Sequence, residues 1–74
     1  MKNNVELGDT GLVISGLYRR PKDRRVMMCM ADAEKGIWLH ELKSPPAITP
    51  AEDVRHNWYG SRSGFDSAGW RQLT

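Results

Sequence analysis

RVMMCMADAEKGIWLHEL, residues 25–42, is the most apolar stretch of the chain, so a compact core must be built chiefly from it. Residues 26–31 are continuously apolar, which is typical of a strand covered on both faces, although periodicity alone also fits a buried helix. Side chains of a strand alternate between its faces. A strand here would place Val26, Met28 and Met30 on one face and Met27, Cys29 and Ala31 on the other.

Two structures remain open for this stretch. In the first, residues 32–36 form a loop in which Gly36 supplies a positive φ, and residues 37–42 return as the second strand of a hairpin. In the second, a helix covers residues 22–35, with Pro21 at its first position and Gly36 just past its end. We favour the hairpin, because turn signals separate three short apolar runs at the spacing typical of all-β domains.

The residues before this stretch also predict short strands. Residues 1–4 are polar and are expected to fray, and residues 5–7 could begin an edge strand. A turn over residues 8–11 then leads into a strand at 12–14, and Gly16 interrupts it as a bulge or bend. The strand continues through Leu17 and Tyr18, and Pro21 occupies the corner of the turn that leads back to Val26.

Within this region, GDTGLVISG, residues 8–16, resembles the opening of a KOW-type segment, the short β-turn-β signature of SH3-like small barrels in ribosomal and transcription-elongation proteins. The resemblance covers these nine residues and implies an SH3-like barrel that contacts nucleic acid. The family pattern has a glycine after the basic residue that follows the strand. Residues 18–23 lack that glycine.

The second half of the chain contains the clearest local signal. Residues 43–48 are a proline-rich linker. Thr49, Pro50 and Glu52 then form a capping box that predicts a helix from 50 to about 58, ending near Gly60. A Gly/Ser loop is expected over 61–69, and residues 70–73 form either a terminal strand that pairs with the first strand or, over 71–74, a frayed tail.

Together these elements predict one mainly β domain over residues 1–74. It is a small SH3-like or partly open barrel or meander of four to five short strands with one short helix at about 50–58. The alternative is an α+β fold with the helix at 22–35. With 74 residues and 39% hydrophobic content, the core is small, so self-association is one way to cover the remaining apolar surface.

Composition also bears on location. The one cysteine, Cys29, has no partner for a disulfide within the chain, which favours a reducing compartment. No apolar stretch reaches the ~20 residues that span a bilayer, and the first residues lack the apolar core of a signal peptide. We therefore expect a cytoplasmic protein with no membrane partner.

The net charge is only +2, but five of the eleven basic residues fall between Arg19 and Arg25. Such a turn could bind the phosphates of nucleic acid or an acidic protein surface, with an aromatic ring beside it to stack a base. The predicted partner site is this basic turn. Its residues are Tyr18, Arg19, Arg20, Lys22, Arg24 and Arg25.

An alternative surface lies among the aromatic residues of the region 54–70. Aromatic rings and arginine dominate the energetics of protein interfaces. This surface would suit a protein-protein adaptor or inhibitor of the kind that phages and bacteria encode. Its residues are Trp58, Tyr59, Arg62, Phe65 and Trp70.

Catalytic and metal sites are not indicated. His40 and His56 do not fall in any spacing typical of metal ligands, and residues 60–64 place their serines at the wrong positions for a nucleophile elbow. No phosphate-binding glycine motif is present. We therefore expect a binding module that is not an enzyme and holds no cofactor or metal.

Overall fold

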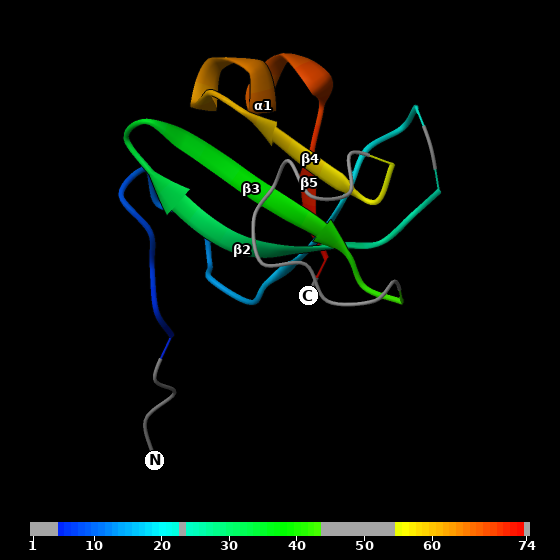
Figure 1. Ribbon diagram of the computed structural model, residues 1–74, viewed down its shortest axis with the longest axis horizontal. Helices are drawn as coiled ribbons and strands as arrows, with labels where there is room; N and C mark the ends of the chain where they lie inside the picture. Colours follow the sequence, from blue (N-terminus) through cyan, green and yellow to red (C-terminus); the bar gives the residue numbers. More distant parts are fainter. Residues whose placement is uncertain (1–4, 23, 44–54, 74) are drawn as a thin grey trace.

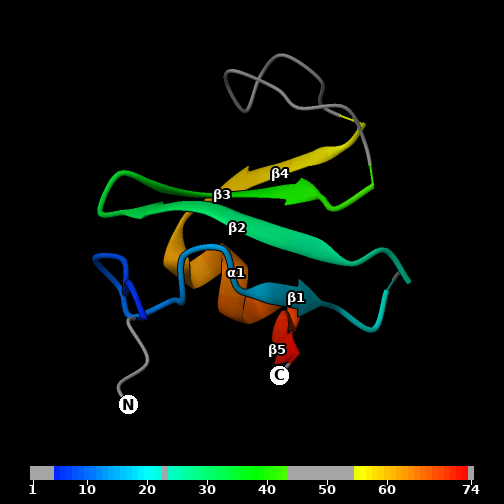
Figure 2. The ribbon, with the colours of Figure 1, turned by 90° about the horizontal axis from the view of Figure 1, so that it is seen from below.

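The computed structural model describes residues 5–22, 24–43 and 55–73. Its elements, in order, are β1 (Leu17–Arg19), β2 (Met27–Ala33), β3 (Gly36–Glu41), β4 (Asn57–Gly60), α1 (Arg62–Ala68) and β5 (Arg71–Leu73). All strand pairs are antiparallel, in one sheet of order β4-β3-β2-β1-β5. The helix α1 lies on one face of this sheet (Figures 1 and 2). The predicted class, mainly β with four to five short strands and one short helix, is confirmed, although the observed helix lies at a different place in the sequence.

The methionine-rich stretch forms the hairpin β2–β3, so the alternative helix over residues 22–35 is wrong. The connecting turn is two residues, Glu34 and Lys35, shorter than the predicted loop. The strands pair from Met27↔Glu41 to Ala33↔Gly36. Burial of the inward-facing apolar side chains of both strands outweighs the helix propensity of Met, Ala, Glu and Lys, since a hairpin in the middle of a sheet also satisfies its backbone on both sides.

A β-bulge between Cys29 and Ala31 changes which side chains of β2 face the core. Before the bulge, Met27 and Cys29 point inward and are fully buried, as the alternation predicts. After it, Asp32 is buried and Ala31 is only half-buried, because the extra residue reverses the alternation. The bulge therefore directs a carboxylate into the protein.

The Asp32 carboxylate organises the loop that precedes β1. Its Oδ2 accepts hydrogen bonds from the backbone N–H groups of Thr10 and Leu12, both at 3.0 Å, and its Oδ1 accepts one from the Thr10 hydroxyl at 2.7 Å. The backbone of Gly8 passes so close that an added Cβ would lie 2.2 Å from Cβ of Asp32. The Asp32 side chain thus satisfies backbone N–H groups of the loop that a neighbouring strand would satisfy in a sheet.

That loop differs from the predicted strand at 12–14. Val13 forms a single bridge with Leu7, and the chain then turns, with the Gly16 N–H donating to the Val13 carbonyl at 2.9 Å. Ser15 occupies the turn at a φ of 67°. The regular strand β1 begins only at Leu17, because the polar backbone groups before it are satisfied by the turn and by Asp32.

The one helix found in the described residues occupies the segment predicted to be a Gly/Ser loop. The Ser61 hydroxyl caps its N-terminus by accepting from the Gly64 N–H at 3.0 Å, and Gly69 ends it in the left-handed conformation at φ 82°. Seven residues are too few to show helical periodicity in the sequence. The helix is stabilised by burial of Phe65 and by the caps at Ser61 and Gly69. Of the predicted helix at about 50–58, residues 50–54 lie outside the described residues, and Asn57 and Trp58 belong to β4.

The core lies between the sheet and α1. Its buried apolar residues come from several elements and from the loop before β1: Leu12, Tyr18, Met27, Cys29, Ile37, Leu39, Phe65 and Trp70. Of the two alternatives for the C-terminus, the terminal strand is observed, since β5 pairs with β1 from Leu17↔Leu73 to Arg19↔Arg71. The predicted linker at 43–48 lies, after Lys43, outside the described residues. Among the residues described, no helix has the length and apolar character needed to cross a membrane.

Candidate functional site

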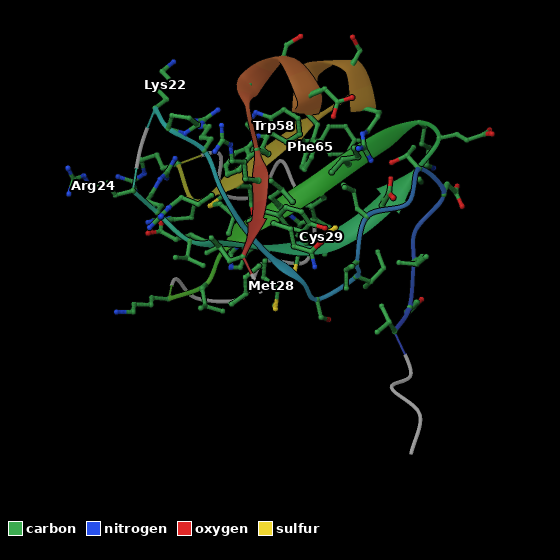
Figure 3. The ribbon with its side chains drawn as sticks, turned by 180° about the vertical axis from the view of Figure 1, so that it is seen from behind. Lys22, Arg24, Met28, Cys29, Trp58 and Phe65 are labelled. Carbon is green, nitrogen blue, oxygen red and sulfur yellow. The ribbon has the colours of Figure 1, made fainter. Side chains whose placement is uncertain are left out.

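The predicted basic turn is the connection between β1 and β2. Arg19 ends β1, and Lys22 and Arg24 follow with exposed side chains. Figure 3 shows Lys22 and Arg24 at the outer margin of this connection, pointing away from the body of the protein. The turn therefore presents positive charge to solvent at one end of the sheet.

β5 adds a cation that the sequence analysis missed. Arg71 pairs directly with Arg19 across β1 and β5, and both side chains are exposed. Opposite residues of an antiparallel pair have Cβ atoms ~5 Å apart, and like charges placed so close destabilise the sheet. No local signal marks Arg71, because its position beside Arg19 depends on the pairing of the two ends of the described chain.

Arg20 is held at the centre of this group by an aromatic ring. Its Cζ lies 4.8 Å from the centroid of the Trp70 ring, in a cation–π contact. Trp70 is only 7% exposed. Two shallow depressions meet here, one lined by Arg19, Arg20, Pro21, Arg71 and Leu73, the other by Arg19, Arg20, Pro21 and Arg24. We call the basic residues of this surface, Arg19, Arg20, Lys22, Arg24 and Arg71, the cationic face.

Arg25 has a different environment from the rest of the predicted turn. Its Nη1 donates to the Arg55 carbonyl at 2.6 Å and lies 3.8 Å from Oε1 of Glu41. The same carboxylate oxygen is 3.9 Å from Nε2 of His56. Arg25 thus links the start of β2 to the end of β3 and the start of β4, and its charge is partly offset by Glu41.

Tyr18, predicted to stack a base, lies in the core instead. It is 3% exposed, its hydroxyl oxygen accepts from the Val13 N–H at 3.0 Å, and its ring meets Phe65 edge to face with centroids 5.6 Å apart. Strand alternation explains the difference, because Tyr18 points to the face of β1 opposite that of Arg19. The ring is therefore not available to a ligand on the cationic face.

Most of the alternative aromatic surface is also interior. Phe65 and Trp70 are buried, and the half-buried Trp58 has its ring centroid 6.1 Å from that of Phe65 and 5.9 Å from that of Trp70. Arg62 donates to the Thr10 carbonyl at 2.9 Å and to Asp66 at 3.1 Å. The three rings pack α1 against the sheet, and Arg62 joins the helix to the loop before β1.

Tyr59 is the exposed aromatic residue of that set. It is 53% exposed, and its hydroxyl lies 3.5 Å from the Lys35 carbonyl, at the turn between β2 and β3. This turn is at the opposite end of β2 from the basic connection. Tyr59 is therefore remote from the basic turn, whereas the buried Trp70 of the same set contacts Arg20.

A polar cluster that the sequence did not reveal joins β3 to β4. Oδ1 of Asn57 accepts from the Trp38 indole N–H at 2.9 Å and lies 2.6 Å from Nδ1 of His40, which is 5% exposed. An amide oxygen only accepts, so Nδ1 of His40 must carry a proton. The cluster cross-links the two strands. Within the described residues, no three His, Cys, Asp or Glu side chains gather as a metal site.

Cys29 is buried at the centre of β2, and its thiol is expected to be unreactive. Burial, together with the nearby Asp32 carboxylate, raises the pKa of this thiol from the ordinary 9.0 to about 11. At pH 8 this lowers the thiolate fraction ~100-fold. The pKa of Cys29 is higher in the folded than in the unfolded protein. Its contribution to the free energy of unfolding is therefore complete below pH 9 and is lost as the pH rises through about 11.

We therefore expect iodoacetamide to alkylate Cys29 at least ~100-fold more slowly in the native protein at pH 8 than in the protein unfolded by urea. Mass spectrometry of timed samples measures both rates. The unfolded chain is the control, since it has the same thiol without burial. Equal rates in the two states would contradict the buried position of Cys29.

The sequence matches no protein-family model, and comparison with curated proteins and with solved structures finds no significant match to either. The inference of function therefore depends on the residues themselves.

Proposed function

We propose that this protein is a small non-enzymatic binding module that holds a polyanionic macromolecule on its cationic face. The main support is the Arg19–Arg71 pair. Two exposed guanidinium groups on directly paired residues cost stability in the free protein, and an anion between them relieves that repulsion. Arginine forks also hold phosphate or carboxylate oxygens in bidentate geometry.

The arrangement of the other cations supports the same function. Arg20 is fixed over Trp70, while Lys22 and Arg24 extend the positive surface along the connection to β2. A polymer that carries one negative charge on each repeating unit would contact all the basic residues of the cationic face. A small SH3-like barrel is part of this proposal, and the single five-stranded sheet with one short helix supports it, although residues 12–14 form no regular strand. A reducing cytoplasm is the proposed location.

A second candidate, a protein-protein adaptor that docks through its aromatic region, now depends on Tyr59. The 53% exposure of this ring is the observation that favours it. Replacing Tyr59 with alanine and repeating a pull-down from host lysate tests this candidate. An unchanged set of captured proteins would count against it.

The main proposal is tested by fluorescence anisotropy with labelled DNA, RNA and polyglutamate at about 50 and 200 mM salt. The variant is the double substitution Arg19→Gln/Arg71→Gln, which leaves Arg20 on Trp70 and Arg25 on Glu41. We expect at least tenfold weaker binding, and for double-stranded DNA a salt dependence lower by about two counterions. The matched control is Lys35→Glu, which changes the net charge by the same amount at the far end of the sheet and should bind nearly as the wild type does.

The proposal is wrong if the wild-type protein binds none of these polyanions at tens of micromolar in low salt. It is also wrong if the double variant and Lys35→Glu weaken binding equally, because net charge alone would then account for the effect.

A further inference from the structure

We infer that the ligand of the cationic face is the phosphate backbone of a nucleic acid, bound without stacking of its bases on aromatic rings. This inference rests on the proposed function and deepens it by naming the partner. It follows from where the aromatic rings lie. All six aromatic residues of the sequence, three Trp, two Tyr and one Phe, belong to the described part of the chain.

The rings nearest the cationic face are not accessible to a base. Tyr18 is 3% exposed and Trp70 is 7% exposed. Trp70 packs on Phe65 with a ring-centroid distance of 6.3 Å, and the guanidinium of Arg20 lies over its ring. Proteins that stack single-stranded bases do so on exposed rings beside the positive groove. The Trp70 ring instead holds the guanidinium of Arg20 in a cation–π contact.

The half-buried Trp58 lies nearer to the cationic face, but its ring packs edge to face against those of Phe65 and Trp70 as part of the core. The other accessible rings are far from the cationic face. Tyr59 and the half-buried Trp38 are cross-strand neighbours on β4 and β3, and the Tyr59 hydroxyl reaches the turn after β2. The seven residues of β2 separate that turn from the basic connection, a distance of about 20 Å. A base attached to a phosphate held by Arg19 and Arg71 would not reach these rings.

The same observations favour a nucleic acid over an acidic protein. Protein interfaces are usually centred on a buried aromatic or aliphatic anchor that is surrounded by a polar rim. The depressions between the cations offer only Pro21 and Leu73 as apolar lining. Phosphate contacts, in contrast, supply most of the affinity of nucleic-acid complexes that do not read sequence.

The test compares three labelled polyanions of equal length and charge by fluorescence anisotropy at about 50 mM salt. They are a mixed-sequence single-stranded DNA, the same deoxyribose-phosphate backbone without bases, and polyglutamate. We expect the abasic backbone to bind within threefold of the DNA, because each stacked base would contribute about fivefold or more. Polyglutamate should bind more weakly than either, and Arg19→Gln/Arg71→Gln should weaken DNA and abasic binding by the same factor.

Loss of more than threefold on removing the bases overturns this inference and leaves the proposed function intact. Polyglutamate binding as tight as that of DNA also overturns it, in favour of an acidic protein partner. Absence of binding to all three overturns the inference, and the proposed function falls with it when double-stranded DNA and RNA also fail to bind.

Discussion

Replacing Asp32 with alanine is expected to lower the free energy of unfolding by about 3 kcal/mol or more. The carboxylate is 6% exposed and accepts hydrogen bonds from the Thr10 N–H, the Thr10 hydroxyl and the Leu12 N–H. Alanine would leave these donors without their acceptor, and the buried Leu12 N–H could not turn to water. Urea denaturation followed by tryptophan fluorescence measures the change.

Two variants separate loss of the acceptor from general disturbance of the loop. Asp32→Asn keeps an acceptor oxygen in nearly the same volume and should cost only about 1 kcal/mol. Asp9→Ala removes a single exposed bond, that from the Glu34 N–H to Oδ2 at 3.1 Å, and should cost less than about 1 kcal/mol. If Asp32→Ala were as stable as Asp9→Ala, the carboxylate would not be what holds the loop.

The second large effect is expected at Phe65, the buried residue of α1. Phe65→Ala should cost about 3–5 kcal/mol, because it removes a ring that is 2% exposed and lies among those of Tyr18, Trp58 and Trp70. The total free energy of unfolding of a domain of this size is only ~4–11 kcal/mol. A seven-residue helix does not persist alone, so α1 should lose its structure with the ring.

Circular dichroism and urea denaturation of the variant measure both effects. Ser67→Ala is the matched control, since it truncates an exposed side chain of the same helix and should change stability by less than about 0.5 kcal/mol. A Phe65→Ala protein within about 1 kcal/mol of the wild type would show that α1 is not anchored to the core through this ring.

The β2–β3 hairpin at the centre of the core was predictable, because apolar runs and turn residues are local features of the sequence. The apolar run before Asp32 and the apolar return after Gly36 predicted the hairpin, and alternation predicted that Met27 and Cys29 share a face. The prediction failed just after Cys29, because no local pattern marks a β-bulge. That failure matters, since the bulge turns Asp32 inward and so creates the anchor of the preceding loop.

The candidate site was predicted only in part. The density of arginine and lysine between residues 19 and 25 identified the positive turn, but Tyr18 was assigned to it and Arg71 was not. Both errors have one cause. The direction of a side chain on a three-residue strand, and the neighbour it meets across the sheet, depend on pairing with a distant segment.

By itself, the sequence favoured the hairpin over a helix and determined the concentration of positive charge beside it, because apolar runs, turn residues and charge density act over a few neighbouring positions. Only the tertiary structure decided that Arg71 lies opposite Arg19, that Arg20 rests on Trp70, and that the ring of Tyr18 is withdrawn from the surface. These contacts join segments from opposite ends of the chain. Their free energy comes from burial and pairing in the completed sheet, which no local stretch of sequence contains.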